Sequence, residues 1–206
     1  MNIRIRCGHG LRVAAVCLFA LAGAPAASAQ ASLAPASPRA ALPSTSLYRL
    51  AVPLTDSTGQ RFDWHQLAGR PALVTMFYGD CNAACPIIIE NLRRTVAALK
   101  PARGAISVLM VSLDPLHDSP ASLATLAGVD KLDPAVFRLA VAANETQTRA
   151  MASALQVKYR SLDGGAINHT TRVSLLDADG SVVASSTELS PIPDPVFVAH
   201  IRKALK

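Results

Sequence analysis

The chain has 206 residues, of which 50% are hydrophobic and 17% charged, and it carries 20 Lys and Arg against 14 Asp and Glu side chains. This positive excess is mild and comes without a basic run or an aromatic ladder, so the sequence gives no sign of a nucleic-acid partner. The length suffices for one domain with an ordinary hydrophobic core.

The first residues have the pattern of a secretory signal. Three arginines precede an apolar stretch at 13–24, and a small-residue cleavage site follows at 27–29. The apolar stretch is shorter than the roughly 20 residues that a spanning helix needs, which favours a cleaved signal at 1–29 over a permanent anchor. Cys17 raises the alternative of a lipoprotein, although Val16 before it is bulkier than such processing accepts. We expect an exported, periplasmic protein, or one tethered to the inner membrane if the signal is retained.

Removal of this signal changes both the charge and the cysteine content. It takes away three arginines, leaving 17 basic against 14 acidic side chains, and two of the four cysteines, leaving Cys81 and Cys85. Residues 30–46 are rich in Ala, Pro and Ser and are predicted to form a flexible tether. The remaining residues, 47–206, are expected to form one domain.

The hydrophobic pattern then predicts alternating strands and helices. Strands are expected at 50–54, 61–64, 73–78, 106–113, 137–142, 171–176 and 181–185. Helices are expected at 86–100, from 120, at 145–155 and at 195–205. Because crossover helices imply parallel central strands, this order predicts an α/β fold. The expected fold is a mixed sheet flanked by helices, with an N-terminal β-hairpin and an additional late hairpin around the turn at 177–180.

Local signals support several of these boundaries. Ser119 is a predicted N-cap with Pro120 at the first helical position, and Asn144 is a predicted N-cap for the next helix. Asp118 is interpreted as a further capping residue. Trp64 is expected to pack in the core beside the first hairpin.

Cys81 and Cys85 are the most informative residues, because they lie four positions apart at a predicted strand-to-helix turn. Such a pair can form a disulfide, exchange one with a partner, or bind a soft metal ion. Pro86 favours a helix start, which would put Cys85 near the N-cap, where the helix dipole lowers a thiol pKa. Thiolates select soft ions such as Cu(I) or Zn(II).

His169 is a candidate third ligand. It follows the glycines at 164–165 and precedes the predicted strand at 171–176, so it is expected on a flexible loop that could swing toward a metal. Two thiolates and one imidazole would make a trigonal Cu(I) site. Taken alone, a histidine at this position is more often a solvated residue of a loop or strand end than a metal ligand.

Three segments of the chain resemble one known family, the Sco/SenC copper chaperones, which have a thioredoxin-like fold. The segments are 77–86 around the cysteines, 111–120 and the stretch 169–180. The resemblance covers roughly 47–205 and implies that Cys81, Cys85 and His169 bind one copper ion, most readily Cu(I). It departs from the family's usual pattern between the cysteines, where Asn82-Ala83-Ala84 replaces a proline and an acidic residue.

The resemblance also implies partners. It implies delivery of copper, or of reducing equivalents, to the binuclear copper-centre subunit of a haem–copper oxidase. A thiol reductant or another periplasmic copper chaperone would serve as a further partner.

Two further functions are compared with copper binding, and the residues favour only the first of them. A thiol–disulfide oxidoreductase would use Cys81 and Cys85 as a catalytic redox pair and would have no use for His169. A thiol peroxidase would need an arginine beside its cysteine, and Arg93 and Arg94 lie too far along the helix. Whether the protein is an enzyme or a metal carrier without turnover is left undecided by the sequence.

Overall fold

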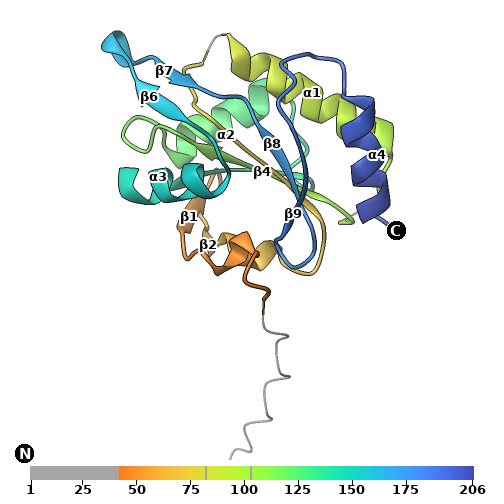
Figure 1. Cartoon of the computed structure of the whole chain (residues 1–206). Coiled ribbons are helices and arrows are strands. Elements are labelled where there is room, and N and C mark those ends of the chain that lie inside the picture. The colour runs from red at the N-terminus through yellow and green to blue at the C-terminus, as the bar shows by residue number, and fades with distance from the viewer. Residues whose placement is uncertain (1–41, 82, 103) are drawn as a thin grey trace, which may run out of the picture. The chain divides into compact units, whose positions relative to one another are not determined.

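The computed structural model describes residues 42–81, 83–102 and 104–206 (Figure 1). The predicted signal at 1–29 and most of the predicted tether at 30–46 therefore lie outside the described residues. In the described part of the chain, no helix is both long and apolar enough to cross a membrane.

A seven-stranded mixed sheet forms the centre of the domain, with strand order β2-β1-β5-β4-β3-β8-β9. Its strands are β1 (Pro53–Asp56), β2 (Arg61–Asp63), β3 (Ala72–Phe77), β4 (Ser107–Ser112), β5 (Phe137–Ala142), β8 (Val173–Leu176) and β9 (Val182–Ser186). The neighbours β3, β4 and β5 are parallel, whereas β1 pairs antiparallel with β5 and β8 pairs antiparallel with β3. The predicted mixed sheet, its N-terminal hairpin and its late hairpin are all confirmed.

Helices cover both faces of this sheet (Figure 1). They are α1 (Ala84–Leu99), α2 (Pro120–Val129), α3 (Glu145–Ala154) and α4 (Pro195–Ala204), with short 3-10 turns η1 (Leu47–Arg49), η2 (Trp64–Leu67) and η3 (Asp163–Gly165). Residues of α1, α2 and α4 pack against one face, and α3, η1 and η2 pack against the other.

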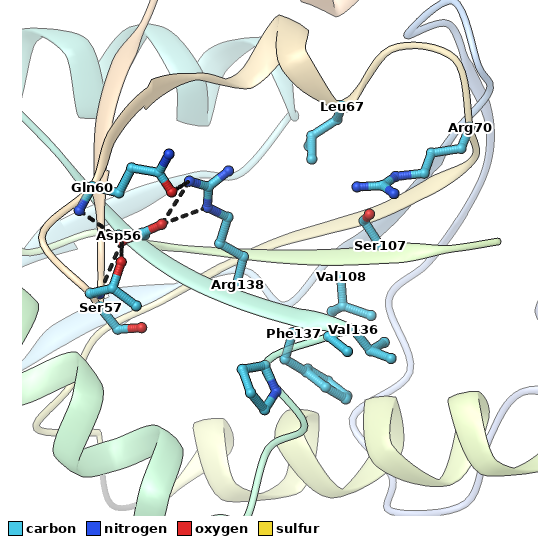
Figure 2. Close-up of a pocket in the computed structure, with 13 residues that line it drawn as sticks. Asp56, Ser57, Gln60, Leu67, Arg70, Ser107, Val108, Val136, Phe137 and Arg138 are labelled. Carbon is cyan, nitrogen blue, oxygen red and sulfur yellow. Dashed lines mark hydrogen bonds and ion pairs between the residues drawn. The ribbon is translucent and has the colours of Figure 1, made fainter. Parts of the chain in front are cut away.

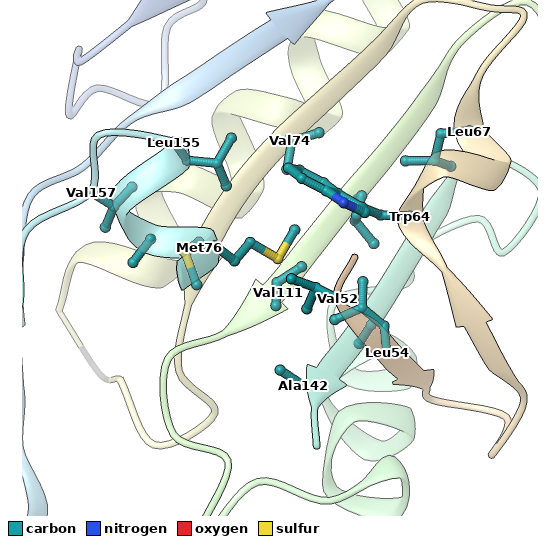
Figure 3. Packing of buried hydrophobic residues seen from close by; sticks show 14 of the residues in the cluster. Val52, Leu54, Trp64, Leu67, Val74, Met76, Val111, Ala142, Leu155 and Val157 are labelled. Carbon is teal, nitrogen blue, oxygen red and sulfur yellow. The ribbon is translucent and has the colours of Figure 1, made fainter. Parts of the chain in front are cut away.

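The central strands are continuously apolar because both of their faces are buried. In β3, Val74 and Met76 point to the face shared with α3, and Leu73 and Phe77 point to the face shared with α1. Figure 3 shows the first of these two layers, in which the indole of Trp64 packs over Val74. Trp64 is fully buried, as predicted. Its Nε1–H group donates to a backbone carbonyl at 2.7 Å, which leaves no indole polar group unsatisfied.

Several predicted boundaries match the structure, and others differ for local reasons. Ser119 and Asn144 cap α2 and α3 as predicted, each accepting a hydrogen bond from the third residue of its helix. The strand expected at 50–54 begins only at Pro53, because the chain forms η1 just before it. Helix α1 begins at Ala84, two residues earlier than expected, so Cys85 lies inside its first turn.

The β1–β2 turn is fastened to β5 by an ion pair between Asp56 and Arg138 (Figure 2). The Arg138 Nη2 atom lies 2.6 Å from Asp56 Oδ2, and the guanidinium carbon lies 3.4 Å from the centroid of the Phe62 ring. Burial favours the neutral acid, but hydrogen bonds from Thr58 and Arg138 outweigh it and lower the pKa of Asp56. A hollow of about 330 Å³ adjoins this pair, where β4 and β5 begin, at the opposite end of the sheet from the cysteines.

A second, two-stranded sheet was not predicted from the sequence. It consists of β6 (Tyr159–Ser161) and β7 (Ile167–His169), paired antiparallel so that Tyr159 lies opposite His169. Gly164 and Gly165, with φ of 79° and 84°, turn the chain between the two strands. The expectation that His169 lies on a flexible loop is therefore wrong, because the histidine is held at the end of a hydrogen-bonded strand.

Candidate metal centre

Both cysteines lie where the parallel strand β3 passes into α1. Cys81 is in the connecting loop and is 9% exposed, whereas Cys85 is in the first helical turn and is 3% exposed. Both are free thiols. The backbone N–H of Cys85 donates to the sulfur of Cys81 at 3.3 Å, so the helix terminus itself holds that sulfur in place.

This environment separates the acidities of the two thiols. Burial raises the pKa of Cys81, but hydrogen bonds from the Cys85 thiol and from nearby backbone N–H groups outweigh it, so the net pKa is lowered. Burial also raises the pKa of Cys85, and there the adjacent Cys81 adds to the effect. Cys81 is therefore the sulfur that ionises first.

His169 reaches this pair from β7. Its ring meets the ring of Tyr78 edge to face, with centroids 6.0 Å apart, and one ring nitrogen lies 3.2 Å from the carbonyl oxygen of Thr170. Burial lowers the pKa of His169, an effect that the Thr170 carbonyl only partly offsets. The imidazole is thus neutral at neutral pH, which is the form that ligates metals.

The fold brings the three predicted ligands together. One ligand atom from each of Cys81, Cys85 and His169 lies within 4.8 Å of the other two, which forms a group able to hold a metal ion. Their role as ligands remains a prediction. His117, the other histidine near this end of the sheet, is exposed and pairs instead with Asp114 at 2.8 Å.

Asp118 is a residue whose role the sequence interpretation missed. Its place before α2 predicts a helix cap, but its Oδ2 atom accepts hydrogen bonds from the backbone N–H of Gly79 at 2.9 Å and from the hydroxyl of Ser112 at 2.5 Å. Gly79 lies two residues before Cys81, and Ser112 ends β4. Asp118 therefore ties the cysteine loop to the neighbouring strand. Only its position after an apolar strand, where sites of parallel sheets form, could have signalled this.

A comparison with protein families identifies the family of this chain. The SCO1/SenC family matches residues 45–206, which is more than half of the chain. The chain belongs to the SCO1/SenC family.

Solved structures agree with this assignment at the level of the fold. This SCO1/SenC protein is similar to a SCO1/SenC family lipoprotein from Bacillus anthracis, with 18% identity, a TM-score of 0.68 and coverage of 76% of this chain and 94% of that one. It is also similar to Bradyrhizobium japonicum ScoI with copper bound, with 20% identity, a TM-score of 0.61 and coverage of 75% and 96%. A third match is BsSco, described as a member of the Sco family of cytochrome c oxidase assembly proteins, with 16% identity, a TM-score of 0.63 and coverage of 76% and 92%. A comparison with curated proteins gave no match.

The three candidate ligands differ in their exposure to solvent. His169 lines a hollow of about 260 Å³ together with residues of the β6–β7 hairpin, whereas Cys85 is covered by the packing of α1. Of the three side chains, His169 is therefore the one that borders a surface hollow.

Proposed function

We propose that this protein binds a copper ion as Cu(I) through Cys81, Cys85 and His169 and delivers it during assembly of the copper centre of a haem–copper oxidase. The observation that carries the proposal is the convergence of the three ligand atoms within 4.8 Å. Two sulfur ligands and one neutral imidazole form a soft set of the kind that favours Cu(I).

Transfer of the ion follows from the unequal exposure of the ligands. Cys85 is the deepest of the three, and His169 is half-buried at the edge of the hollow. An incoming thiolate of the partner would first bind the copper ion beside His169, and the imidazole would then leave. Further ligands of the partner would replace Cys81 and last Cys85, so that every bond to this chain is exchanged for one to the partner. The ion keeps its oxidation state throughout, so neither protein needs a reductant for this step.

The partner and the location are inferred from the relatives and from the N-terminal pattern. BsSco is a member of a family of oxidase assembly proteins, and the Bacillus anthracis relative is a lipoprotein. In the proposed organisation, residues 1–29 are a secretory signal, 30–46 a tether and 47–206 the copper-binding domain. The protein would act outside the cytoplasmic membrane.

The unequal acidity of the thiols favours a second candidate function, thiol–disulfide exchange. The Cys81 thiolate would attack a client disulfide, form a mixed disulfide and release one client thiolate. Cys85 would then attack Cys81, close an intramolecular disulfide and release the second client thiol. This oxidises the protein by two electrons, so an external dithiol must reduce it again.

Competition for Cu(I) against a chromophoric chelator separates the two functions. The reduced protein should bind one equivalent of copper, and Cys81→Ser, Cys85→Ser and His169→Ala should each weaken binding. The loss should exceed the roughly 10–100-fold typical of outer-shell substitutions, because a ligand itself is removed. His117→Ala is the matched control and should leave the affinity unchanged.

Reduction of a peptide disulfide by the same variants tests the second function. The rate of disulfide reduction should depend on Cys81 and should not change in His169→Ala. An affinity for Cu(I) that does not change in His169→Ala would refute the three-ligand site and would favour the oxidoreductase function.

A further inference from the structure

A basic groove runs along the β6–β7 hairpin next to the candidate metal centre. It consists of a hollow of about 760 Å³ beside α3 and the smaller hollow at His169, and the two share Lys158 and Tyr159 in their linings. We define the groove by its four cations, Arg149, Lys158, Arg160 and Arg172.

No carboxylate in the described part of the chain forms an ion pair with any of these four cations. By contrast, Arg93 and Arg94 share Glu90, and Arg138 pairs with Asp56. No Asp or Glu lines either hollow, so the charged side chains there are the four cations alone. The groove therefore keeps a concentrated positive charge.

Neutral groups hold two of the cations in place. The guanidinium of Arg172 donates to Gln156 at 2.9 Å and also to the hydroxyl of Ser185. The guanidinium carbon of Arg149 lies 5.3 Å from the centroid of the Tyr159 ring. These contacts orient the two arginines without neutralising their charge.

We propose that the basic groove docks an acidic segment of the protein that exchanges copper with this chain. This inference rests on the proposed function, since it names the partner's chemistry at the same site. The groove ends at His169, the ligand on the open side of the centre, so a partner seated there would bring its own ligands to the copper ion. Long-range attraction would speed the encounter and set its orientation.

Other occupants fit these observations less well. Residues 1–41 contain arginines and no acidic residue, so this chain's own N-terminal segment does not complement the groove. A second copy of the chain is also basic overall, with a net charge of +6 for the full sequence and of +3 without residues 1–29. An anionic bilayer is flat on this scale and does not enter a hollow, whereas an acidic polypeptide does.

Binding of an octaglutamate peptide to the metal-free, ¹⁵N-labelled chain tests the proposal by NMR. At low ionic strength, shift changes should concentrate at 149–172 and weaken as salt shortens the screening length. Lys158→Glu/Arg160→Glu should weaken binding at least about tenfold, because two attractive contacts become repulsive. Arg202→Glu/Lys203→Glu, an equal charge change at the exposed end of α4, should change it less than about twofold.

Three results would overturn the proposal. One is that the two double variants bind octaglutamate equally well, or that the NMR shift changes spread over the whole surface of the domain. Another is the same shift pattern with inorganic phosphate at matched charge, which would make the groove a small-anion site. The third is binding to phosphatidylglycerol vesicles that requires Lys158 and Arg160 while octaglutamate leaves the groove unperturbed. Because the peptide is tested without copper, a failure here is distinct from a failure of the three-ligand site.

Discussion

Substitution of Gly79 by alanine should destabilise the domain through Asp118. A methyl group at Gly79 would lie 2.2 Å from Asp118 Oδ1, too close for the carboxylate to stay where it is. The backbone of Gly79 is outside the left-handed region, so alanine meets no conformational strain there. The penalty therefore comes from the displaced carboxylate, which must give up its bonds to the Gly79 N–H and the Ser112 hydroxyl.

The size of the effect follows from those two hydrogen bonds. A hydrogen bond to a charged group contributes about 1.5–3 kcal/mol, and the partial exposure of Asp118 lets water replace part of that. We expect Gly79→Ala to lower the free energy of unfolding by about 2–3 kcal/mol. In an Asp118→Ala background the carboxylate that the new methyl group would meet is absent. Gly79→Ala should then lower the free energy of unfolding by less than about 0.5 kcal/mol.

Urea unfolding followed by the fluorescence of Trp64, the single tryptophan, measures this coupling. The double-mutant cycle should give an interaction energy of about 2 kcal/mol. Gly128→Ala is a matched control, because a methyl group at that glycine of α2 meets nothing within 4 Å, and it should stabilise slightly. Additivity of Gly79→Ala and Asp118→Ala within about 0.5 kcal/mol would refute the reasoning.

Three further outcomes are expected. Iodoacetamide at neutral pH should label Cys81 well before Cys85 in mass spectrometry, because the pKa of Cys81 is lowered and that of Cys85 raised; equal rates would contradict this. Asp56→Asn should lower the free energy of unfolding at pH 7 by about 2 kcal/mol, less than for a fully buried pair because Arg138 keeps solvent contact. Since the folded pKa of Asp56 is lowered, its contribution is complete above the unfolded value of about 3.9 and is lost as pH falls through the folded pKa. The difference in free energy of unfolding between Asp56→Asn and the wild type should therefore disappear as the pH falls below about 4. A difference that stays constant with pH would exclude this linkage. Cu(I) at about 100 times its dissociation constant should add about 2.7 kcal/mol to the stability of the reduced protein and nothing to that of Cys81→Ser.

The features that the sequence determined by itself are those set by neighbouring residues. The apolar runs of β3 and β4 predict buried strands because both of their faces lie under helices. Ser119 and Asn144 predict helix starts because a cap needs only the next three residues. The spacing of Cys81 and Cys85 likewise indicated a thiol site without any knowledge of the tertiary structure.

The tertiary structure decided which distant residues meet. His169 is 84 positions from Cys85, and the β6–β7 pairing that carries it beside the thiols has no strong local signal. Asp118 has the sequence context of a cap, yet its carboxylate bonds to Gly79 and Ser112 on two other segments. Caps and turns depend on backbone angles within a few residues. Ligand clusters and hydrogen bonds between distant segments depend on the order and pairing of all the strands in the sheet. Only the folded chain brings these groups together.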